Sequence, residues 1–217
     1  GKGMFIHRYE FWPTQLDEAG QRFVIDPKKV VNLADNMAPD GTLDWEAPAG
    51  RWTLVRVGHV ATEKTNHPAV EGKGLECDKL SAAAVTHHFN SYIGRIQDLC
   101  KKAGSAPSKT VHLDSYESGS QNWTPKMVEE FTARRGYDPA PWLLTLSGRI
   151  VGSPEQSDRF LAEFRRTVGD LALDNFFGLV TRLAHERGMT TNAQIYGNVF
   201  GEIWDTLQAA GRVDQVE

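Results

Sequence analysis

The sequence predicts an α/β protein: a partial or truncated (β/α) barrel preceded by a short β-rich segment. Residues 1–60 contain short apolar runs separated by turn signals, a pattern typical of β structure. From residue 61 onward, helical patterns alternate with short apolar strands, as they do in parallel βα units. About four strands can be counted, whereas a closed eight-stranded barrel takes about 250 residues by itself. A complete barrel therefore does not fit, and residues 61–217 are expected to be a partial βα barrel.

The first 60 residues are expected to be the trailing part of a β domain. Apolar runs at residues 23–25 and 30–33 are separated by turn-forming residues. Alternating apolar and polar residues at 43–45 and 52–57 predict an antiparallel hairpin that places its two tryptophans in one apolar layer.

Residues 81–104 are predicted to form one helix. Ser81 can cap its first turn, and Gly104 can end it. Apolar residues recur with the 3.6-residue helical period, so one face of this helix is expected in the core. That face comprises Val85, Phe89, Tyr92, Ile93, Ile96, Leu99 and Cys100. Cys100 is expected to be a small buried hydrophobe.

The remaining elements follow the order of parallel βα units. A strand is predicted at residues 110–116, and Thr124-Pro125 is a typical helix start. The next elements are a helix over residues 154–187, a strand at 189–195, a helix at 202–210 and the start of a strand at 212–217. We expect these strands to form one parallel sheet.

Composition narrows the possible functions. The chain has 217 residues, of which 40% are hydrophobic and 24% charged, as expected for a soluble globular protein. Its formal net charge is −4, and its basic residues are scattered, so neither nucleic acid nor an anionic membrane is an expected partner. No apolar run has the length of a membrane-spanning helix. The start at Gly1 shows neither an initiator Met nor a signal-peptide core, which suggests a removed targeting segment or a piece of a longer protein.

Polar side chains are concentrated where the predicted strands end. In parallel βα architectures the loops after the strands open on one face, so these side chains are expected to meet there. The candidates are Asp114, Tyr116 and Glu117 after the first strand, Tyr196 and Asn198 after the second, and Asp214 and Glu217 in the last.

Two carboxyl groups at a strand end suit the hydrolysis of a glycoside. One must protonate the leaving oxygen, and the other must activate water or attack the sugar. Glu117 is the candidate acid, and Trp123 could stack on a sugar ring and raise the pKa of a nearby carboxyl. The alternative is that Asp114 and Glu117 are helix-capping or surface acids.

A second polar patch occupies residues 65–79. Its glycines allow a tight loop, in which Glu76, Asp78 and Lys79 could bind a sugar hydroxyl, a metal or one another. The alternative is an ion-paired loop without substrate contact. The spacing of Gly72 and Gly74 does not match a phosphate-binding loop.

Other catalytic motifs are absent from the sequence. There is no HExxH, paired CxxC, GxSxG, Walker or GxGxxG motif. His87 and His88 are adjacent on a helix and cannot share a face, so they are expected to be ordinary helix residues. His112 is expected to be a satisfied core or layer residue of its strand.

Several stretches together resemble glycoside hydrolase family 106, the bacterial α-L-rhamnosidases. The likeness spans most of the chain from about residue 40, and the combination of motifs carries it. The stretches are Asp40-Gly-Thr-Leu-Asp-Trp45 with residues 50–58, residues 65–69 and 74–79, Asp114-Ser-Tyr-Glu117 with residues 122–125, and residues 134–138.

The resemblance implies a multidomain, periplasmic or secreted enzyme with a βα-barrel catalytic domain. It also implies inverting stereochemistry, a calcium ion near the sugar, and a rhamnose-containing polysaccharide or oligosaccharide as substrate. Residues 61–217 would then be part of the catalytic region, and whether they are active by themselves is open. The other possibility is a non-catalytic carbohydrate-binding domain derived from a glycosidase barrel.

By this resemblance Glu117 matches the general acid, and Glu217 matches an active-site glutamate at the end of a later strand. Whether Glu217 is the base is open, because the partner carboxylate could also lie outside this chain. An inverting pair of carboxyls is expected about 6.5–9.5 Å apart, and a retaining pair about 5–5.5 Å. The candidate sugar-binding residues are Asp78, Lys79, Asp114, Tyr116, Asn122, Trp123, Tyr196 and Asn198. No metal ligand is identified.

Overall fold

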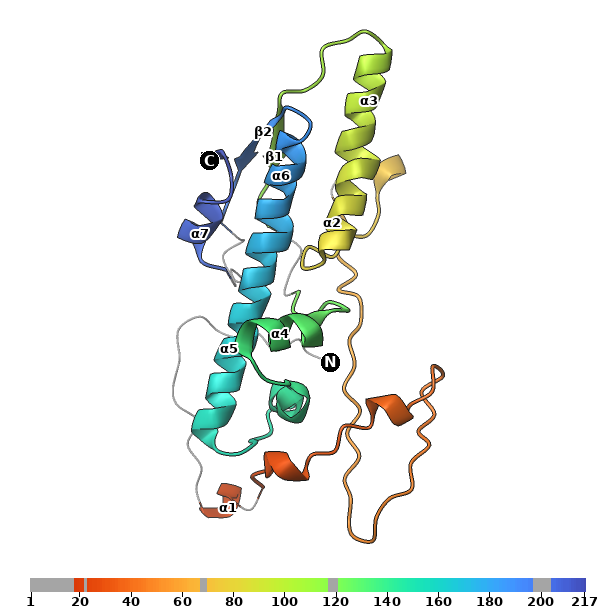
Figure 1. Cartoon of the computed structure of the whole chain (residues 1–217), viewed down its shortest axis with the longest axis vertical. Coiled ribbons are helices and arrows are strands. Elements are labelled where there is room, and N and C mark those ends of the chain that lie inside the picture. The colour runs from red at the N-terminus through yellow and green to blue at the C-terminus, as the bar shows by residue number, and fades with distance from the viewer. Residues whose placement is uncertain (1–17, 22, 67–69, 117–120, 197–203) are drawn as a thin grey trace. The chain divides into compact units, whose positions relative to one another are not determined.

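The computed structural model describes residues 18–21, 23–66, 70–116, 121–196 and 204–217, and it has an α/β fold (Figure 1). Three parallel strands form one sheet in the order β1-β2-β3. They are β1 Thr110–Leu113, β2 Thr190–Ala193 and β3 Gln215–Val216. The prediction of a parallel sheet is therefore confirmed, whereas a barrel remains a prediction.

The helices precede the first strand and separate the three strands along the chain. The α-helices are α1 Glu18–Gln21, α2 Ala82–Phe89, α3 Arg95–Lys102, α4 Met127–Arg135, α5 Pro154–Ala172, α6 Leu179–His185 and α7 Thr206–Ala210. Short 3-10 helices lie at Pro27–Lys29, Ala34–Asn36, Val70–Gly72 and Ala140–Ser147. Two π-helical turns, Asn90–Gly94 and Leu173–Gly178, join α2 to α3 and α5 to α6.

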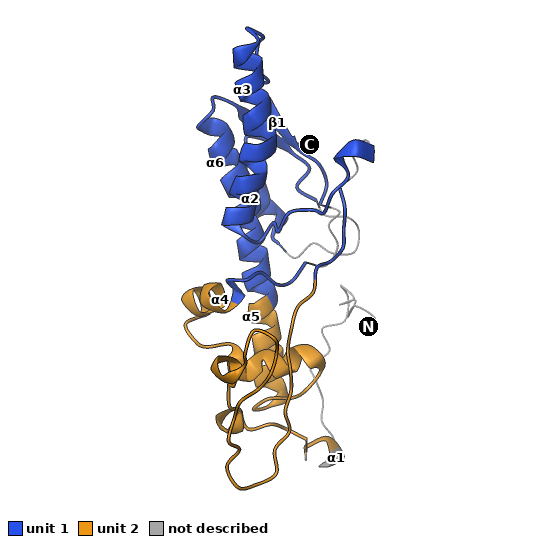
Figure 2. Cartoon of the chain, turned by 90° about the vertical axis from the view of Figure 1, so that its right-hand side faces the viewer, with its two compact units in different colours: residues 1–10, 61–127, 165–217 blue, residues 11–60, 128–164 orange. Residues whose placement is uncertain are grey.

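The chain divides into two compact units (Figure 2). Unit 1 comprises residues 1–10, 61–127 and 165–217 and contains the sheet, whereas unit 2 comprises residues 11–60 and 128–164. The expected division into a β-rich segment of residues 1–60 and a barrel region of residues 61–217 remains a prediction, because compactness within this chain does not define the domains of a longer polypeptide.

Helices cover one face of the sheet in unit 1. Val111 and Leu113 of β1 are buried together with Thr191 and Ala193 of β2, and α6 packs against β2. Helix α2 packs in turn on α6 (Figure 1). The opposite face carries polar side chains, of which His112 is exposed. The alternation along β1 therefore separates an apolar face from a polar one.

The predicted helix over residues 81–104 contains an unpredicted π-helical turn. Ser81 caps α2 by accepting a hydrogen bond from the backbone N–H of Ala84, as expected. A π turn holds one more residue than an α turn, so it rotates the following face by about 100°. Tyr92, Ile96 and Leu99, all expected in the core, are therefore exposed.

The buried positions are Gly94, the last residue of this turn, and Gln97 in α3. The side-chain amide of Gln97 donates to the carbonyl oxygen of Ser108 at 2.7 Å. Cys100 is half-buried, so its expected burial is realised only in part.

The second long helical pattern is interrupted in the same way. Phe160, Phe164, Val168 and Leu171 lie on the predicted stripe of α5 and are buried. After the π-helical turn begins at Leu173, Phe177 is buried in the position expected for Phe176.

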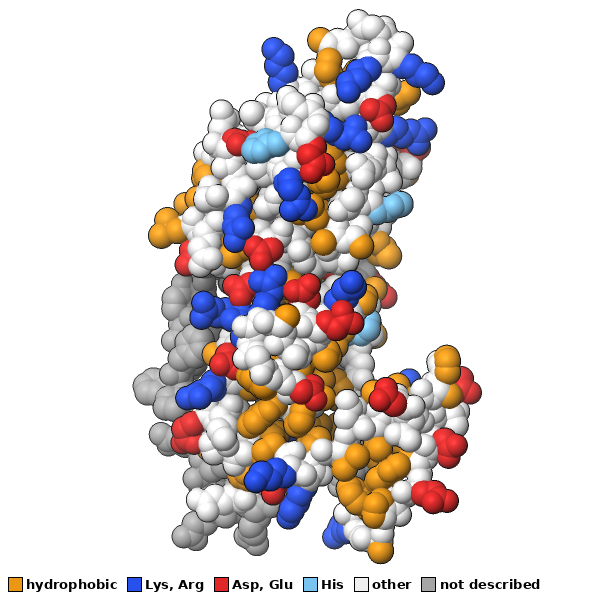
Figure 3. Space-filling view, in the orientation of Figure 1, with side chains coloured by type: hydrophobic (Ala, Val, Ile, Leu, Met, Phe, Trp, Pro, Cys, Tyr) orange, Lys and Arg blue, Asp and Glu red, His pale blue; other side chains and the backbone are white. Residues whose placement is uncertain are grey.

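The strands expected in residues 23–57 are not formed in the described part of that segment. Its backbone pairing consists of isolated bridges, Met37 with Leu43 and Ile25 with Val151. The rings of Trp45 and Trp52 do contact each other, edge to face, with centroids 5.2 Å apart. Strands need a hydrogen-bonded partner as well as alternating side chains, and no strand of the described residues pairs with residues 52–57. Large apolar side chains of this segment are consequently exposed, as Figure 3 shows.

Candidate active site

Three strand ends meet at one edge of the sheet in unit 1. Leu113 pairs with Ala193, and Ala193 pairs with Val216, so the residues that follow these three lie side by side. The backbone N–H of Gln194 donates to the carbonyl of Leu113 at 2.9 Å, and that of Glu217 donates to Ala193 at 3.0 Å. The chain thus brings Asp114, Gln194 and Glu217 to the carboxyl edge of the sheet, where loop residues of βα folds carry out chemistry.

Glu217 lies beside His112, which was expected to be a satisfied core or layer residue of its strand. The carboxylate of Glu217 is 3.7 Å from Nδ1 of His112, and both side chains are exposed. The same Nδ1 is 2.8 Å from Oδ1 of Asn192, so a proton on Nδ1 is donated to that oxygen. His112 is therefore a hydrogen-bonded residue of the polar face of the sheet and not a core residue, because the described helices do not cover that face.

Asp114 and Tyr116 have different environments although they are two residues apart. Asp114 is exposed, and its carboxylate accepts from the backbone N–H of Ser115 at 2.8 Å. Tyr116 is buried, with its ring edge-to-face against Trp204 at 4.9 Å. Burial, reinforced by the negative charges of Asp78 and Glu76, raises the pKa of Tyr116 well above its usual value. The phenol is therefore a neutral hydrogen-bond donor at physiological pH.

Asp78 anchors the segment that follows β1. Its Oδ2 accepts from the hydroxyl of Thr124 at 2.7 Å, and its Oδ1 accepts from the side-chain amide of Gln121. Oδ1 also accepts from the backbone N–H of Leu80 at 3.0 Å. The hydroxyl of Tyr116 donates to Oε1 of Gln121 at 3.3 Å. Asp78, Tyr116, Gln121 and Thr124 thus form a network, called the Asp78 clamp below, on both sides of residues 117–120.

Lys79 is a buried cation next to this clamp. The residue is 7% exposed, and its ammonium group forms an ion pair with Glu76. Its Nζ also lies 5.4 Å from the ring centroid of Tyr116 and 5.7 Å from that of Phe176, within the range of cation–π attraction. Of the three roles considered for this loop, binding of its own residues to one another is the one the contacts realise.

The other predicted site residues are spread between surface and interior. Asn122 is exposed, Trp123 is half-buried, and Tyr196 is 57% exposed after β2. Glu117 and Asn198 lie outside the described residues, so the separation of Glu117 and Glu217 is not among the described distances.

Asp214 is not at the carboxyl edge, contrary to expectation. It precedes β3 and accepts from the backbone N–H of Thr191 at 2.8 Å and from the Thr191 hydroxyl at 3.1 Å. The Nε2 of His185 lies 2.9 Å from the same carboxylate. The Thr191 N–H, followed by the His185 hydrogen bond, lowers the pKa of Asp214. A strand shorter than predicted leaves this residue at the opposite end.

Sequence reasoning missed three members of the site. The sequence indicates Thr124 as a helix start and part of a family motif and Asn192 as part of a strand, and no pattern marks Gln121. The alternation of β1 could have revealed the pairing of His112 with Asn192, because polar residues at matched positions share a face. Nothing local in the sequence predicts the contact of Gln121 with Asp78, which are 43 residues apart.

The described residues do not assemble a carboxylate-based metal centre. No group of three or more His, Cys, Asp or Glu side chains in the described ranges could hold a metal ion. Asp78, one of the predicted oxygen donors, already receives protein hydrogen bonds on both oxygens. Within the same ranges, no helix is long and apolar enough to cross a membrane.

A parallel βα sheet with carboxylates at its carboxyl edge is an arrangement that suits glycoside hydrolases. The chain belongs to one family of these enzymes: the model of the α-L-rhamnosidase family, glycoside hydrolase family 106, matches residues 1–217. The resemblance inferred from the motifs is therefore confirmed.

Two relatives place the chain within much longer proteins. It is 38% identical over 197 residues to a Formosa agariphila protein that carries a provisional β-glucuronidase name, covering 89% of this chain and 16% of that protein. It is also similar to the solved structure of a rhamnosidase from Novosphingobium sp. PP1Y, with 35% identity and a TM-score of 0.72, covering 87% of this chain and 19% of that one. The chain thus spans less than a fifth of either relative.

Proposed function

We propose that the complete polypeptide is an exported α-L-rhamnosidase that removes terminal rhamnose from polysaccharides or oligosaccharides with inversion at the anomeric carbon. The match of the rhamnosidase family model to residues 1–217 carries this proposal. The similarity to a solved rhamnosidase, and the strand ends that meet at one sheet edge, support it. Periplasmic or extracellular location is part of the same proposal.

Glu117 is the proposed general acid. It directly follows Tyr116 and precedes Gln121 by four residues, and both of these belong to the Asp78 clamp. The clamp holds the described residues on both sides of Glu117 by hydrogen bonds. We infer that Asp78 acts on catalysis through these flanking residues, as a positioning residue rather than as a sugar ligand.

Glu217 is the proposed second active-site carboxylate. Its place at the carboxyl edge beside β2 fits a group that orders water or binds a sugar hydroxyl. His112, held by Asn192, lies next to it as a hydrogen-bonding group. Whether Glu217 is the base depends on its distance from Glu117, for which inversion requires about 6.5–9.5 Å.

The deciding experiment is hydrolysis of an aryl α-L-rhamnoside by the full-length protein and by its Glu117→Gln variant. Loss of the acid is expected to lower kcat by about 10²–10⁴ without changing the melting temperature. The exposed Glu129→Gln change is the matched control and should leave kcat unaltered. Proton NMR of the first-formed rhamnose should show the anomer opposite to that of the substrate; retention would refute the mechanism.

A β-glucuronidase is the second candidate, favoured by the name of the Formosa agariphila relative. The same assay with an aryl β-D-glucuronide separates the two activities, since the preferred substrate will have the larger kcat/KM. A third outcome, binding of sugar without turnover of either glycoside, would identify the non-catalytic carbohydrate-binding domain.

Calcium enters this proposal through the family resemblance alone, and no catalytic step is assigned to it. Chelation of the full-length enzyme should abolish turnover of the rhamnoside, and added Ca²⁺ should restore it. Full activity in the metal-free enzyme would remove calcium from the proposal.

A further inference from the structure

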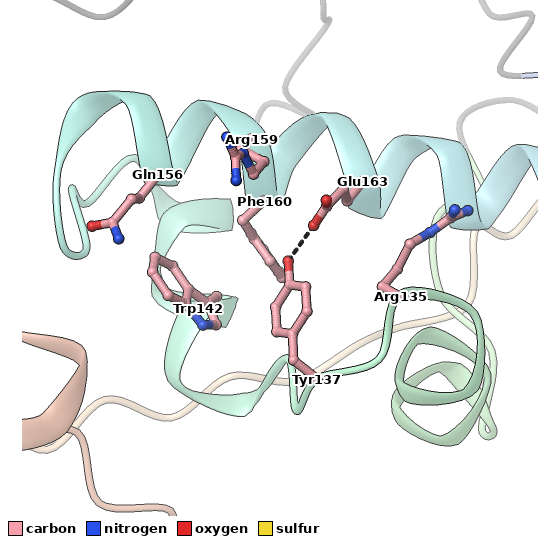
Figure 4. Close-up of a pocket in the computed structure, with 7 residues that line it drawn as sticks. All are labelled: Arg135, Tyr137, Trp142, Gln156, Arg159, Phe160 and Glu163. Atoms are coloured by element: carbon pink, nitrogen blue, oxygen red, sulfur yellow. Dashed lines mark hydrogen bonds between the residues drawn. The ribbon is translucent and has the colours of Figure 1, made fainter.

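Unit 2 contains a cavity that the proposed reaction does not use. Its volume is about 350 Å³, at the lower end of the roughly 300–1,000 Å³ range of small-molecule sites. All of its lining residues lie between positions 135 and 163, from the last residue of α4 through the 3-10 helix Ala140–Ser147 and along α5 (Figure 4). A space of this size fits one or two sugar units.

Aromatic rings form the apolar part of this cavity. Phe160 is 1% exposed, and Trp142 is stacked on it at an interplanar angle of 23° and a centroid distance of 6.4 Å. Trp142 and Tyr137 are half-buried, so each keeps part of its surface open to a ligand. Flat, partly exposed rings of this kind suit the C–H face of a pyranose.

Charged groups form the polar part. The hydroxyl of Tyr137 donates to Oε2 of Glu163 at 2.6 Å (Figure 4). Burial and this hydrogen bond raise the pKa of Tyr137, so its phenol stays neutral. Arg135 and Arg159 also line the cavity, and Gln156 is exposed beside them. Two guanidinium groups and one carboxylate thus line the cavity, and Arg159 is the more exposed of the two arginines.

We propose that this cavity is a non-catalytic binding site for an acidic pyranose, a hexuronate unit of a polysaccharide. Arg159 pairs with the sugar carboxylate, because a guanidinium group matches a carboxylate with two parallel hydrogen bonds. The ring lies on Trp142, and Gln156 binds a hydroxyl. The cavity holds a single carboxylate, Glu163, so it lacks the pair of carboxyls that glycoside hydrolysis requires.

The test is calorimetric titration of the full-length protein with methyl β-D-glucuronide and with its neutral counterpart, methyl β-D-glucoside. Saturating L-rhamnose in both titrations keeps the proposed catalytic site occupied. The glucuronide is expected to bind at least about tenfold more tightly, the difference that one charge-assisted hydrogen-bonded pair supplies.

Variants connect this binding to the cavity. Arg159→Gln should weaken glucuronide binding about tenfold and remove the preference over the glucoside. Arg166→Gln is the matched control, an exposed arginine of the same helix that does not line the cavity. Trp142→Phe should weaken both glycosides while leaving the fold intact.

Three results would overturn the proposal: equal binding of the two glycosides, glucuronide binding that survives Arg159→Gln, or no binding to the full-length protein. Competition by an equal concentration of acetate would also overturn it, because the cavity would then hold any carboxylate. None of these outcomes depends on rhamnoside hydrolysis, so this inference and the proposed activity fail independently.

Discussion

The two ends of the sheet in unit 1 use their carboxylates differently. At the amino end, Asp214 receives hydrogen bonds from Thr191 and His185 and is satisfied within the protein. At the carboxyl end, Asp114 and Glu217 are exposed. Satisfied and exposed carboxylates are thus separated along strands of two to four residues.

The Asp78 clamp is an exception to this separation. Its hydrogen bonds are made within the protein, although it holds residues that follow the carboxyl end of β1. Both of its carboxylate oxygens are occupied by protein donors, as at the amino end, yet they hold the residues around Glu117. The comparison therefore predicts that Asp78 and Asp214 differ in what their loss changes.

Of the two carboxylates compared here, Asp78 is expected to show the larger effect, in the change Asp78→Asn. An amide keeps one acceptor oxygen and replaces the other with a donor, so it cannot accept from both Gln121 and Thr124. Displacement of the Glu117 segment should lower kcat about 10–10²-fold in rhamnoside hydrolysis, with a much smaller change in KM.

The control for this change is Asp44→Asn, an exposed aspartate of unit 2, which should leave kcat unaltered. A kinetic assay of Asp78→Asn that shows a large rise in KM at unchanged kcat would instead make Asp78 a direct sugar ligand.

A smaller effect, on stability and not on catalysis, is expected for Asp214→Asn. Loss of charge-assisted hydrogen bonds at this partly exposed site should lower the free energy of unfolding by about 1 kcal/mol. Its kcat should equal that of the wild type, because the carboxylate lies at the end of the sheet away from the proposed chemistry. A urea titration together with the rhamnoside assay measures both, and a fall in kcat would end the proposed division of roles.

The smallest effect is the pH dependence of that stability difference. The folded-state pKa of Asp214 lies below its ordinary value of 3.8, so its charged form stabilises the folded protein above that value. The stabilisation is lost as the pH falls through the lowered folded-state pKa. Melting temperatures of wild type and Asp214→Asn should therefore differ at pH 7 and converge below about pH 4.

Local patterns predicted the sheet better than the site. The alternation of β1 and the order of helices and strands were sufficient to predict that the strands pair in parallel and that polar residues lie at the carboxyl edge of the sheet. The hairpin predicted for residues 43–57 is not formed. Alternation shows which residues can form a strand, but a strand also needs a partner strand. The clamp could not be predicted, because α2, α3 and β1 lie between Asp78 and Gln121 in the sequence and their contact depends on how these elements pack.

Because of the π-helical turn Leu173–Gly178, the packing of α6 depends on the number of residues in this turn more than on their identity. Asn175 within the turn donates to the carbonyl of Leu80 at 2.8 Å, so the extra residue is tied to the loop that carries the clamp. Deleting one residue there would restore an α-helical repeat and turn α6 by about 100°. Leu179, Val180 and Ala184 would then leave the interior that they now occupy. In sequences related to this one, a gap between residues 173 and 178 should accompany a compensating change in α2 or β2.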